Sequence, residues 1–266
     1  MSTISILSIG NELLKGNTVN TNLAFIAKEA TSRGHKVVLA MEIQDVSGEI
    51  CKALKYALSE AECVITTGGL GPTFDDMTLE SISHCLGLES RVDERALDLV
   101  SSRLPHGAEM TEARKKMAYM PEGAEPISNP AGTAPGMLLK HGTKIIMSFP
   151  GVPREMAAMI PGSLENLPKS NLSYYQESVF VLGLYESLFS PVVDRLMKYY
   201  SGKIYIKSHP RSSGGKSVLE LEVSSYAKSE DEGRRLVADS LRSIREVAEQ
   251  MGGRILSGQE IPRNWE

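Results

Sequence analysis

The sequence has little of several features that mark particular classes of protein. It contains three cysteines in 266 residues and no Cys-x-x-Cys pair, so it predicts neither a disulfide framework nor a zinc site and favours a reducing cytoplasm. The formal net charge of −4 lacks the basic excess of a general nucleic-acid binder. No basic segment opens the chain, and no apolar run approaches the ~20 residues of a membrane span. We therefore expect a cytoplasmic protein that partners neither nucleic acid nor a membrane.

What the sequence does contain is the alternation typical of an α/β domain. Short, β-branched apolar segments predict strands at residues 3–9, 36–41, 63–67 and 144–149. Apolar residues at helical spacing lie between the first three of these segments, with Gly34 after one predicted helix and Ser47 as the predicted N-cap of the next. Strands joined through helices by short links predict a mostly parallel sheet sandwiched by helices.

The pattern changes after residue 168, which predicts a second and smaller domain. Residues 169–175 are polar and typical of a linker. A strand at 178–182, a helix ending near residue 200, strands at 203–207 and 217–225, and a last helix capped by Ser229 follow. We expect a first domain at residues 1–168, an α+β domain at 175–253, and a C-terminal tail at 254–266.

The most informative segment follows the predicted strand at 63–67. Residues 68–76 read Gly-Gly-Leu-Gly-Pro-Thr-Phe-Asp-Asp, and glycines at the carboxyl end of a parallel strand let backbone N–H groups approach an anion. The segment lacks the third glycine of a dinucleotide fingerprint and the Gly-Lys-Ser/Thr of a P-loop. Two adjacent aspartates suit a phosphate site chiefly when a divalent cation lies between them. The alternative is that Asp76 caps the next helix and the glycines form a tight turn.

Further candidate segments lie at the ends of the other strands. The loop at 10–22 is rich in Asn and Thr, which cap a helix or bind ribose hydroxyls or a base, and Asp45 is an N-cap candidate at the same edge of the sheet. Residues 129–136 are small and uncharged, which suits close approach by a ligand, and residues 149–156 place Pro153 in the first turn of a helix. Simple turns are the alternative for both segments. The basic cluster at 114–116 reads as a solvated helix face that could still contact a phosphate.

Together these loops resemble the N-terminal part of the CinA (competence/damage-inducible) family. The first domain of that family belongs to the molybdopterin-binding superfamily of molybdenum-cofactor biosynthesis proteins. Residues 175–252 resemble the small KH-type domain that follows in the family, with residues 183–187 at its entry motif. The matching segments of the first domain occur in the expected order at residues 8–14, 66–78, 121–124, 129–136 and 150–153, with Glu155-Met156 just beyond.

The resemblance implies a metal-dependent hydrolase that cleaves the diphosphate linkage of a nucleotide, with ADP-ribose converted to AMP and ribose 5-phosphate. Asp45 and Asp76 would hold a divalent ion such as Mg²⁺, and Asp75 or Glu12 would accept the proton of the attacking water. The alternative is a carrier that binds molybdopterin or a nucleotide without turnover. Family members also suggest a homodimer. The substrate-binding residues implied by position are Gly68, Gly69, Gly71, Thr73, Asn129, Gly132, Thr133, Pro150 and Gly151.

The sequence departs from the family in ways that narrow these expectations. Asn11 replaces an aspartate that is frequent before the Glu-Leu-Leu segment, which removes one possible metal ligand. The small domain lacks the Gly-x-x-Gly loop with which KH domains clamp nucleic acid. Relatives commonly continue into an amidohydrolase domain, whereas the sequence here ends at Glu266, so we expect no deamidation of nicotinamide mononucleotide.

Overall fold

The computed structural model describes residues 1–105, 107–213 and 215–261, and the chain divides into two compact units. Unit 1 comprises residues 1–31 and 35–170, and unit 2 comprises residues 32–34 and 171–266. Among the described residues, none of the helices has the length and apolar character needed to cross a membrane.

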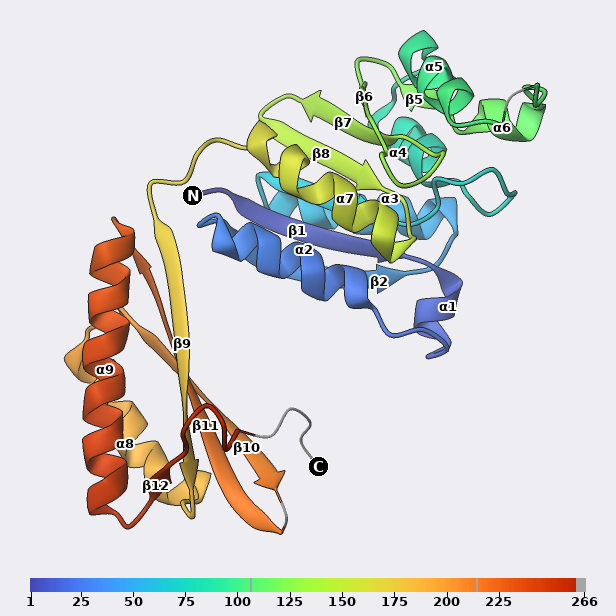
Figure 1. Ribbon diagram of the computed structural model, residues 1–266. Coiled ribbons are helices and arrows are strands. Elements are labelled where there is room, and N and C mark those ends of the chain that lie inside the picture. Colours follow the sequence, from blue (N-terminus) through green and yellow to red (C-terminus); the bar gives the residue numbers. More distant parts are fainter. Residues whose placement is uncertain (106, 214, 262–266) are drawn as a thin grey trace. The chain divides into compact units, whose positions relative to one another are not determined.

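Unit 1 is built on a six-stranded sheet in the order β2-β1-β3-β8-β7-β6 (Figure 1). The first four strands pair in parallel, and β7 and β6 pair antiparallel with their neighbours. The prediction of a mixed α/β fold with a mostly parallel sheet is therefore confirmed. The strands are β1 (Thr3–Ile9), β2 (Lys36–Ile43), β3 (Cys63–Thr67), β6 (Glu125–Ile127), β7 (Gly136–His141) and β8 (Lys144–Phe149).

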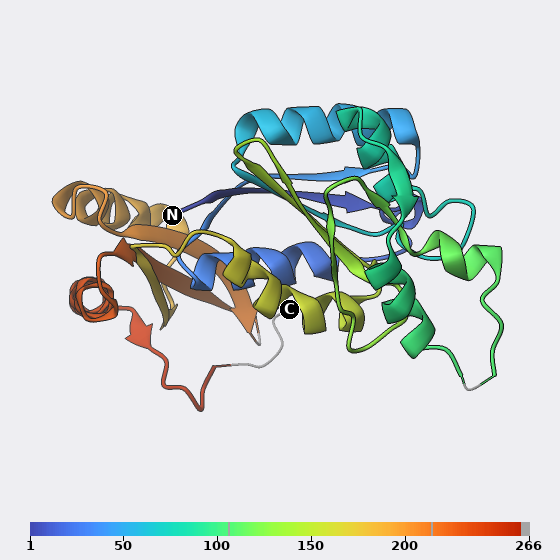
Figure 2. The same cartoon turned by 90° about the horizontal axis from the view of Figure 1, so that it is seen from above.

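Helices cover both faces of this sheet, as Figures 1 and 2 show. On one face α2 (Thr21–Ser32) and α7 (Pro153–Ser163) bury Ile26 and Met156 against the sheet. On the other face α3 (Ser47–Glu60) and α4 (Thr78–Leu86) bury Leu54 and Ile82. Strands β1 and β3 contribute to both apolar clusters, which explains why they are almost continuously apolar in sequence.

Several short elements complete unit 1. Strands β4 (Ser90–Val92) and β5 (Tyr119–Pro121) form a separate two-stranded sheet. The remaining elements are α1 (Asn11–Leu14), α5 (Glu94–Ser102), α6 (Glu112–Lys116) and the 3-10 helix η1 (Leu164–Asn166).

Unit 2 is a four-stranded antiparallel sheet in the order β10-β11-β9-β12, and its two helices share one apolar cluster with the sheet. Ser229 caps the long last helix by accepting a hydrogen bond from the backbone N–H of Glu232, as predicted. The predicted linker at 169–175 is too long, because the first strand already begins at Ser173. The relation of this unit to KH-type domains stays a prediction. Its elements are β9 (Ser173–Leu182), α8 (Glu186–Tyr199), β10 (Tyr205–Ser213), β11 (Lys216–Ala227), α9 (Glu230–Gln250) and β12 (Arg254–Ile255).

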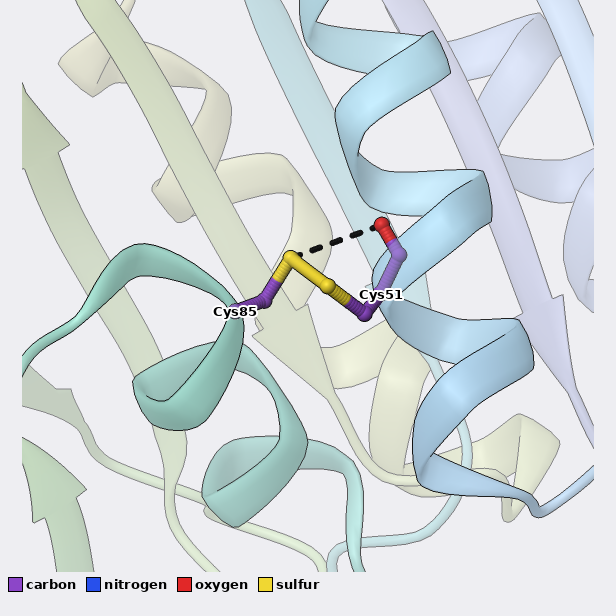
Figure 3. The surroundings of a disulfide bond; sticks show 2 residues. All are labelled: Cys51 and Cys85. Atoms are coloured by element: carbon purple, nitrogen blue, oxygen red, sulfur yellow. Dashed lines mark hydrogen bonds between the residues drawn. A yellow bond between two sulfur atoms is a disulfide. The ribbon is translucent and has the colours of Figure 1, made fainter.

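The expectation of no disulfide is wrong. Cys51 on α3 and Cys85 on α4 form a disulfide with a Cα–Cα distance of 5.2 Å (Figure 3). The two residues are 34 positions apart in sequence and carry no recognisable spacing. Their pairing depends on the packing of α3 beside α4 on one face of the sheet. The third cysteine, Cys63, is free and buried, and burial raises the pKa of its thiol to about 12.

Candidate active site

The strand order creates a crevice at the carboxyl ends of β1 and β3. From β1 the chain leads to β2 on one side, and it then returns to β3 on the other side. Open α/β sheets bind ligands where connections diverge in this way. Glu12, on the short helix α1, follows the first of these strands, and the glycine segment at 68–71 follows the second.

Gly68 lies at the tightest point of this crevice. Its φ is +106°, and a Cβ atom built on it would lie 2.1 Å from the carbonyl oxygen of Ile9, the last residue of β1. Its backbone N–H donates to the carbonyl oxygen of Phe149, at the end of β8. The ends of three neighbouring strands therefore meet at a position where only glycine fits.

Asn22 connects the same strand ends, although the sequence did not single it out. Its side-chain amide donates to the Thr67 hydroxyl at 2.9 Å and to the Gly151 carbonyl oxygen at 2.8 Å. The Thr67 hydroxyl in turn donates to the carbonyl oxygen of Pro150 at 3.0 Å. The helix-capping role considered for this loop falls to Asn20, whose side chain accepts from the backbone N–H of Leu23. Asn22 itself is buried and holds the loop after β8 against β3.

A cavity of about 640 Å³ occupies the crevice. Eleven of the thirteen residues predicted for the site line it. The acidic ones are Glu12, Asp45, Asp75 and Asp76, and the others are Gly68, Gly69, Gly71, Thr73, Thr133, Pro150 and Gly151.

The three aspartates lie in loops held by backbone and hydroxyl donors. The backbone N–H of Asn11 donates to Asp45 at 2.8 Å, and Asp76 accepts from both the N–H and the hydroxyl of Thr73, at 2.8 and 2.7 Å. The Thr73 hydroxyl also lies within hydrogen-bond reach of Asp75. Neither Asp45 nor Asp76 caps a helix, because the N-cap positions of α3 and α4 are the following residues, Val46 and Met77. The capping alternatives are therefore wrong, and Ser47 begins α3 instead of capping it.

The pKa values of Asp45 and Asp75 are shifted in opposite directions. Burial raises the pKa of Asp45, and the nearby charges of Glu12 and Asp75 raise it further, against the lowering effect of the Asn11 N–H. The Thr73 hydroxyl lowers the pKa of Asp75, and the Lys116 ammonium lowers it further. The acidic side of the cavity therefore already contains mutual repulsion, which a bound cation would relieve.

Two predicted substrate-binding residues, Asn129 and Gly132, do not line this cavity. The Asn129 side chain is buried and donates to the carbonyl oxygen of Ala134 and to the Glu155 carboxylate, at 2.9 and 2.7 Å. A Cβ atom on Gly132 would lie 2.2 Å from that same carboxylate. These residues therefore support the wall of the cavity, whereas Glu155 itself reaches the cavity from the first turn of α7.

Arginines line the cavity together with these carboxylates. Arg103 follows α5 and Arg114 lies on α6. The sequence signal for Arg114 was the basic cluster at 114–116, which was interpreted mainly as a solvated helix face. Arginine guanidinium groups pair with phosphate oxygens in a bidentate geometry. The cavity thus combines carboxylates with guanidinium groups, a combination suited to a phosphate ester and a cation together.

The donor set fits a hard divalent cation only in part. Carboxylate oxygens are the ligands that Mg²⁺ prefers, and this ion commonly combines one or two carboxylates with phosphate oxygens of a substrate. In the described part of the chain, no cluster of three or more His, Cys, Asp or Glu side chains is arranged to hold a metal ion. Asp45 and Asp76 would therefore need a ligand phosphate to complete the coordination of such an ion.

The first domain matches a known protein family. Residues 5–169 match the family described as "Probable molybdopterin binding domain", and the chain belongs to it. A protein of Caldivirga maquilingensis is 43% identical over 241 residues, which make up 90% of this chain and 94% of that protein. A protein of Thermoplasma acidophilum is 40% identical over 256 residues, covering 96% of this chain and 99% of that protein.

A solved structure supports the resemblance drawn from the loops. The crystal structure of the protein CinA with unknown function from Thermoplasma acidophilum shares 43% identity and a TM-score of 0.58. It covers 62% of this chain and 97% of that chain. The resemblance to CinA is therefore confirmed for the first domain.

Proposed function

We propose that this protein hydrolyses the phosphoanhydride linkage of a nucleotide, with ADP-ribose as the substrate and AMP and ribose 5-phosphate as products. One observation carries the proposal: carboxylates from the loops after β1, β2 and β3 meet in one cavity that two arginines also line. A diphosphate needs cationic partners for its oxygens and a base for the attacking water. The cavity offers groups of both kinds.

The chain's own residues would bind and orient the diphosphate. In the described part of the chain, the backbone N–H groups of Gly69, Leu70 and Gly71 donate no hydrogen bond, so they are free for phosphate oxygens. Arg103 and Arg114 would pair with the same group. A divalent ion held by Asp45 and Asp76 would supply charge neutralisation and lower the pKa of a coordinated water.

Glu12 is the better candidate for the group that accepts the proton of the attacking water. Its carboxylate is exposed to the cavity, next to Gly10. Asp75 is the poorer candidate, because the hydrogen bond from the Thr73 hydroxyl lowers the pKa of its carboxylate and already occupies one of its oxygens. We therefore assign proton transfer to Glu12. Asp75 would contribute negative charge to the site.

The test is incubation of the purified protein with ADP-ribose and Mg²⁺ or Mn²⁺, with AMP followed by chromatography. We expect turnover that EDTA abolishes and that Asp76→Ala reduces at least a hundredfold, as is typical for loss of a charge that stabilises a transition state. Asp98→Ala is the matched control, because Asp98 is an exposed carboxylate on α5 outside the cavity. Full activity in Asp76→Ala would contradict the metal assignment.

A carrier function is the second candidate, and the family match favours it. The matching family is named for molybdopterin binding, and no preformed cluster of metal ligands exists among the described residues. A pterin phosphate would then occupy the same cavity without being cleaved. Unchanged ADP-ribose after long incubation with several metals, together with measurable binding of a phosphorylated pterin, would favour the carrier.

A further inference from the structure

The sheet of unit 2 has one face that packs against helices and one face that no helix in the described part of this unit covers. Both α8 and α9 share one apolar cluster with Val181, Ile206 and Leu221, so they lie on the same side of the sheet (Figure 1). Because side chains alternate along a strand, the neighbours of these residues belong to the opposite face. This uncovered face consists of the even-numbered residues of β9 and β11 and the odd-numbered residues of β10.

Three tyrosines from three neighbouring strands meet at one end of the uncovered face. Tyr174 of β9 is paired directly with Tyr226 of β11, and their ring centroids are 4.9 Å apart. Tyr205 of β10 is paired with Ser224, two residues before Tyr226, which makes the two tyrosines diagonal neighbours. Tyr205 is 55% exposed and Tyr226 is 37% exposed. Adjacent aromatic rings are therefore accessible on an open sheet surface.

The strand that carries Tyr205 lies in a basic segment of an otherwise acidic chain. Residues 195–219 contain six lysines and arginines and no aspartate or glutamate. Lys207 shares the face of Tyr205, and Lys203 lies in the turn just before β10, where its carbonyl oxygen accepts from the Ser225 hydroxyl at 2.8 Å. Both lysines are exposed, and neither forms an ion pair among the described residues. Positive charge without a partner thus lies on both sides of an exposed aromatic ring.

The uncovered face also carries two carboxylates, and each has a basic partner on β10. The Glu220 carboxylate accepts a hydrogen bond from the Arg211 guanidinium at 2.9 Å. The Glu222 carboxylate lies 3.9 Å from Nε2 of His209 and is paired in register with Lys207. The negative charge of this face is therefore balanced toward the hairpin that joins β10 to β11, away from the tyrosines.

We propose that this end of the uncovered face binds single-stranded nucleic acid. The flat bases of a single strand stack on aromatic rings, and lysines neutralise its phosphates. Exposed aromatic residues on an open four-stranded sheet serve this purpose in one class of RNA-binding domain. A duplex keeps its bases stacked inside and offers no such contact. The site, a tyrosine platform, consists of Tyr174, Tyr205 and Tyr226 with Lys203 and Lys207.

This mode of binding differs from the one that the sequence argued against. The expectation of no nucleic acid rested on the net charge of −4 and on the missing Gly-x-x-Gly loop. A stacking surface needs no such loop, and it needs positive charge only at the surface itself. The proposal is independent of the hydrolysis proposed for unit 1, so either can fail without the other.

The test uses the full chain and a fluorescein-labelled oligouridine of about 12 nucleotides, with binding followed by fluorescence anisotropy at about 50 mM salt. We expect a dissociation constant of about 1–100 µM. Tyr205→Ala should weaken binding at least fivefold because a stacked base is lost, whereas Tyr205→Phe should stay within about twofold because its ring still stacks. Tyr185→Ala is the matched control, since Tyr185 is an exposed tyrosine at the N-cap of α8, beyond the other end of β9.

A charge variant tests the lysines separately. Lys203→Ala/Lys207→Ala should weaken binding and lower the slope of log affinity against log salt by about 1.4, because each contact with a single-stranded phosphate contributes about 0.7. Lys36→Ala/Lys55→Ala is its control, because it removes the same net charge at two exposed lysines of unit 1. Circular dichroism confirms that each variant is folded.

Several outcomes would overturn the proposal. These are no binding of the oligouridine, equal effects of Tyr185→Ala and Tyr205→Ala, an unchanged salt slope in Lys203→Ala/Lys207→Ala, or tighter binding of a duplex of equal length. A proline-rich peptide that binds in a Tyr205-dependent manner, while the oligonucleotide does not, would identify a protein partner and would also overturn it.

Discussion

Two regions of the same cavity differ in how the protein builds them. The acidic region consists of the segments that follow the buried strands β1 and β3 and the edge strand β2, and backbone groups hold its aspartates in place. The basic region consists of Arg103 and Arg114, which belong to the short helices and loops between β4 and β5. The acidic region is attached to the strands of the main sheet, whereas the basic region belongs to a segment outside that sheet.

The two regions are suited to different tasks. Groups that must hold a cation and align a water need positions fixed to a fraction of an ångström, which buried strand ends provide. Groups that capture an anion can act from longer and more adaptable side chains. Changes to the acidic region should therefore alter stability and chemistry, whereas changes to the basic region should alter affinity alone.

The largest effect on stability is expected from Gly68→Ala, a change at the glycine that packs against the end of β1 in the acidic region. The added Cβ would collide with the Ile9 carbonyl oxygen at a positive φ, and we expect a loss of about 4 kcal/mol or more in the free energy of unfolding. Denaturant titration measures it. Gly123→Ala is the control, since Gly123 also has a positive φ but has no atom within 4 Å of its added Cβ, and only about 1 kcal/mol should be lost there. Equal losses in the two variants would contradict the crowding argument.

Removal of the disulfide should have the next largest effect. Cys51 and Cys85 join α3 and α4, the helices that begin directly after the loops of Asp45 and Asp76. Closing a chain segment of this length is worth about 3–4 kcal/mol in the loop-entropy model. The double variant Cys51→Ser/Cys85→Ser should lose this amount in denaturant titrations, and dithiothreitol should destabilise the wild-type protein similarly but leave the variant unchanged. Three titratable thiols in the untreated protein would refute the prediction.

A change in the basic region should leave stability unaltered. The double variant Arg103→Ala/Arg114→Ala should bind AMP at least tenfold more weakly at low salt, and the deficit should shrink at 0.5 M salt because screening already weakens these charges. Calorimetry measures the affinity, and Arg91→Ala, an exposed arginine outside the cavity, is the control. A fall of several degrees in the Tm of the double variant would show that the basic region is structural after all.

The smallest effect on stability is expected from the charge of Asp45. Because its folded-state pKa is raised, this group stabilises the fold fully at pH values below its unfolded pKa, and that contribution is lost as the pH rises through the raised pKa. Asp45→Asn should therefore raise the Tm by about 1 °C at pH 7 and have no effect near pH 3, while abolishing AMP formation. Thermal scans at both pH values check this expectation. A lower Tm at pH 7 would indicate that the carboxylate is held favourably in the absence of a metal.

Much of the first domain was predictable from local pattern. The expected strands at 3–9, 63–67 and 144–149 coincide with β1, β3 and β8, because β-branched apolar runs bounded by Gly and Pro favour buried strands. The glycine loop and Asp76 could also be identified from local pattern. Their types and spacing suit an anion and a cation wherever they stand at the end of a parallel strand.

Other parts of the site could not be found in this way. Asn22 was one of several Asn and Thr residues of the loop at 10–22 that suited a helix cap, yet its amide bridges β3 and the loop after β8. Asn129 and Gly132 resembled ligand-binding residues, yet both pack against the Glu155 carboxylate, which lines the cavity in their place. Arg103 had no signal at all, since its position in the cavity depends on where α5 ends.

The α/β class of the first domain could be predicted from local pattern, and so could its main strands and a loop suited to a phosphate, because each depends on residues close together in the chain. The packing of the folded chain brings together the loops that share the cavity, the arginines that line it, and the two cysteines that form the disulfide. Each of these depends on strand order and helix packing, which bring together residues between 34 and 129 positions apart. Local propensity carries no information about such pairs, and the packing of the core supplies it.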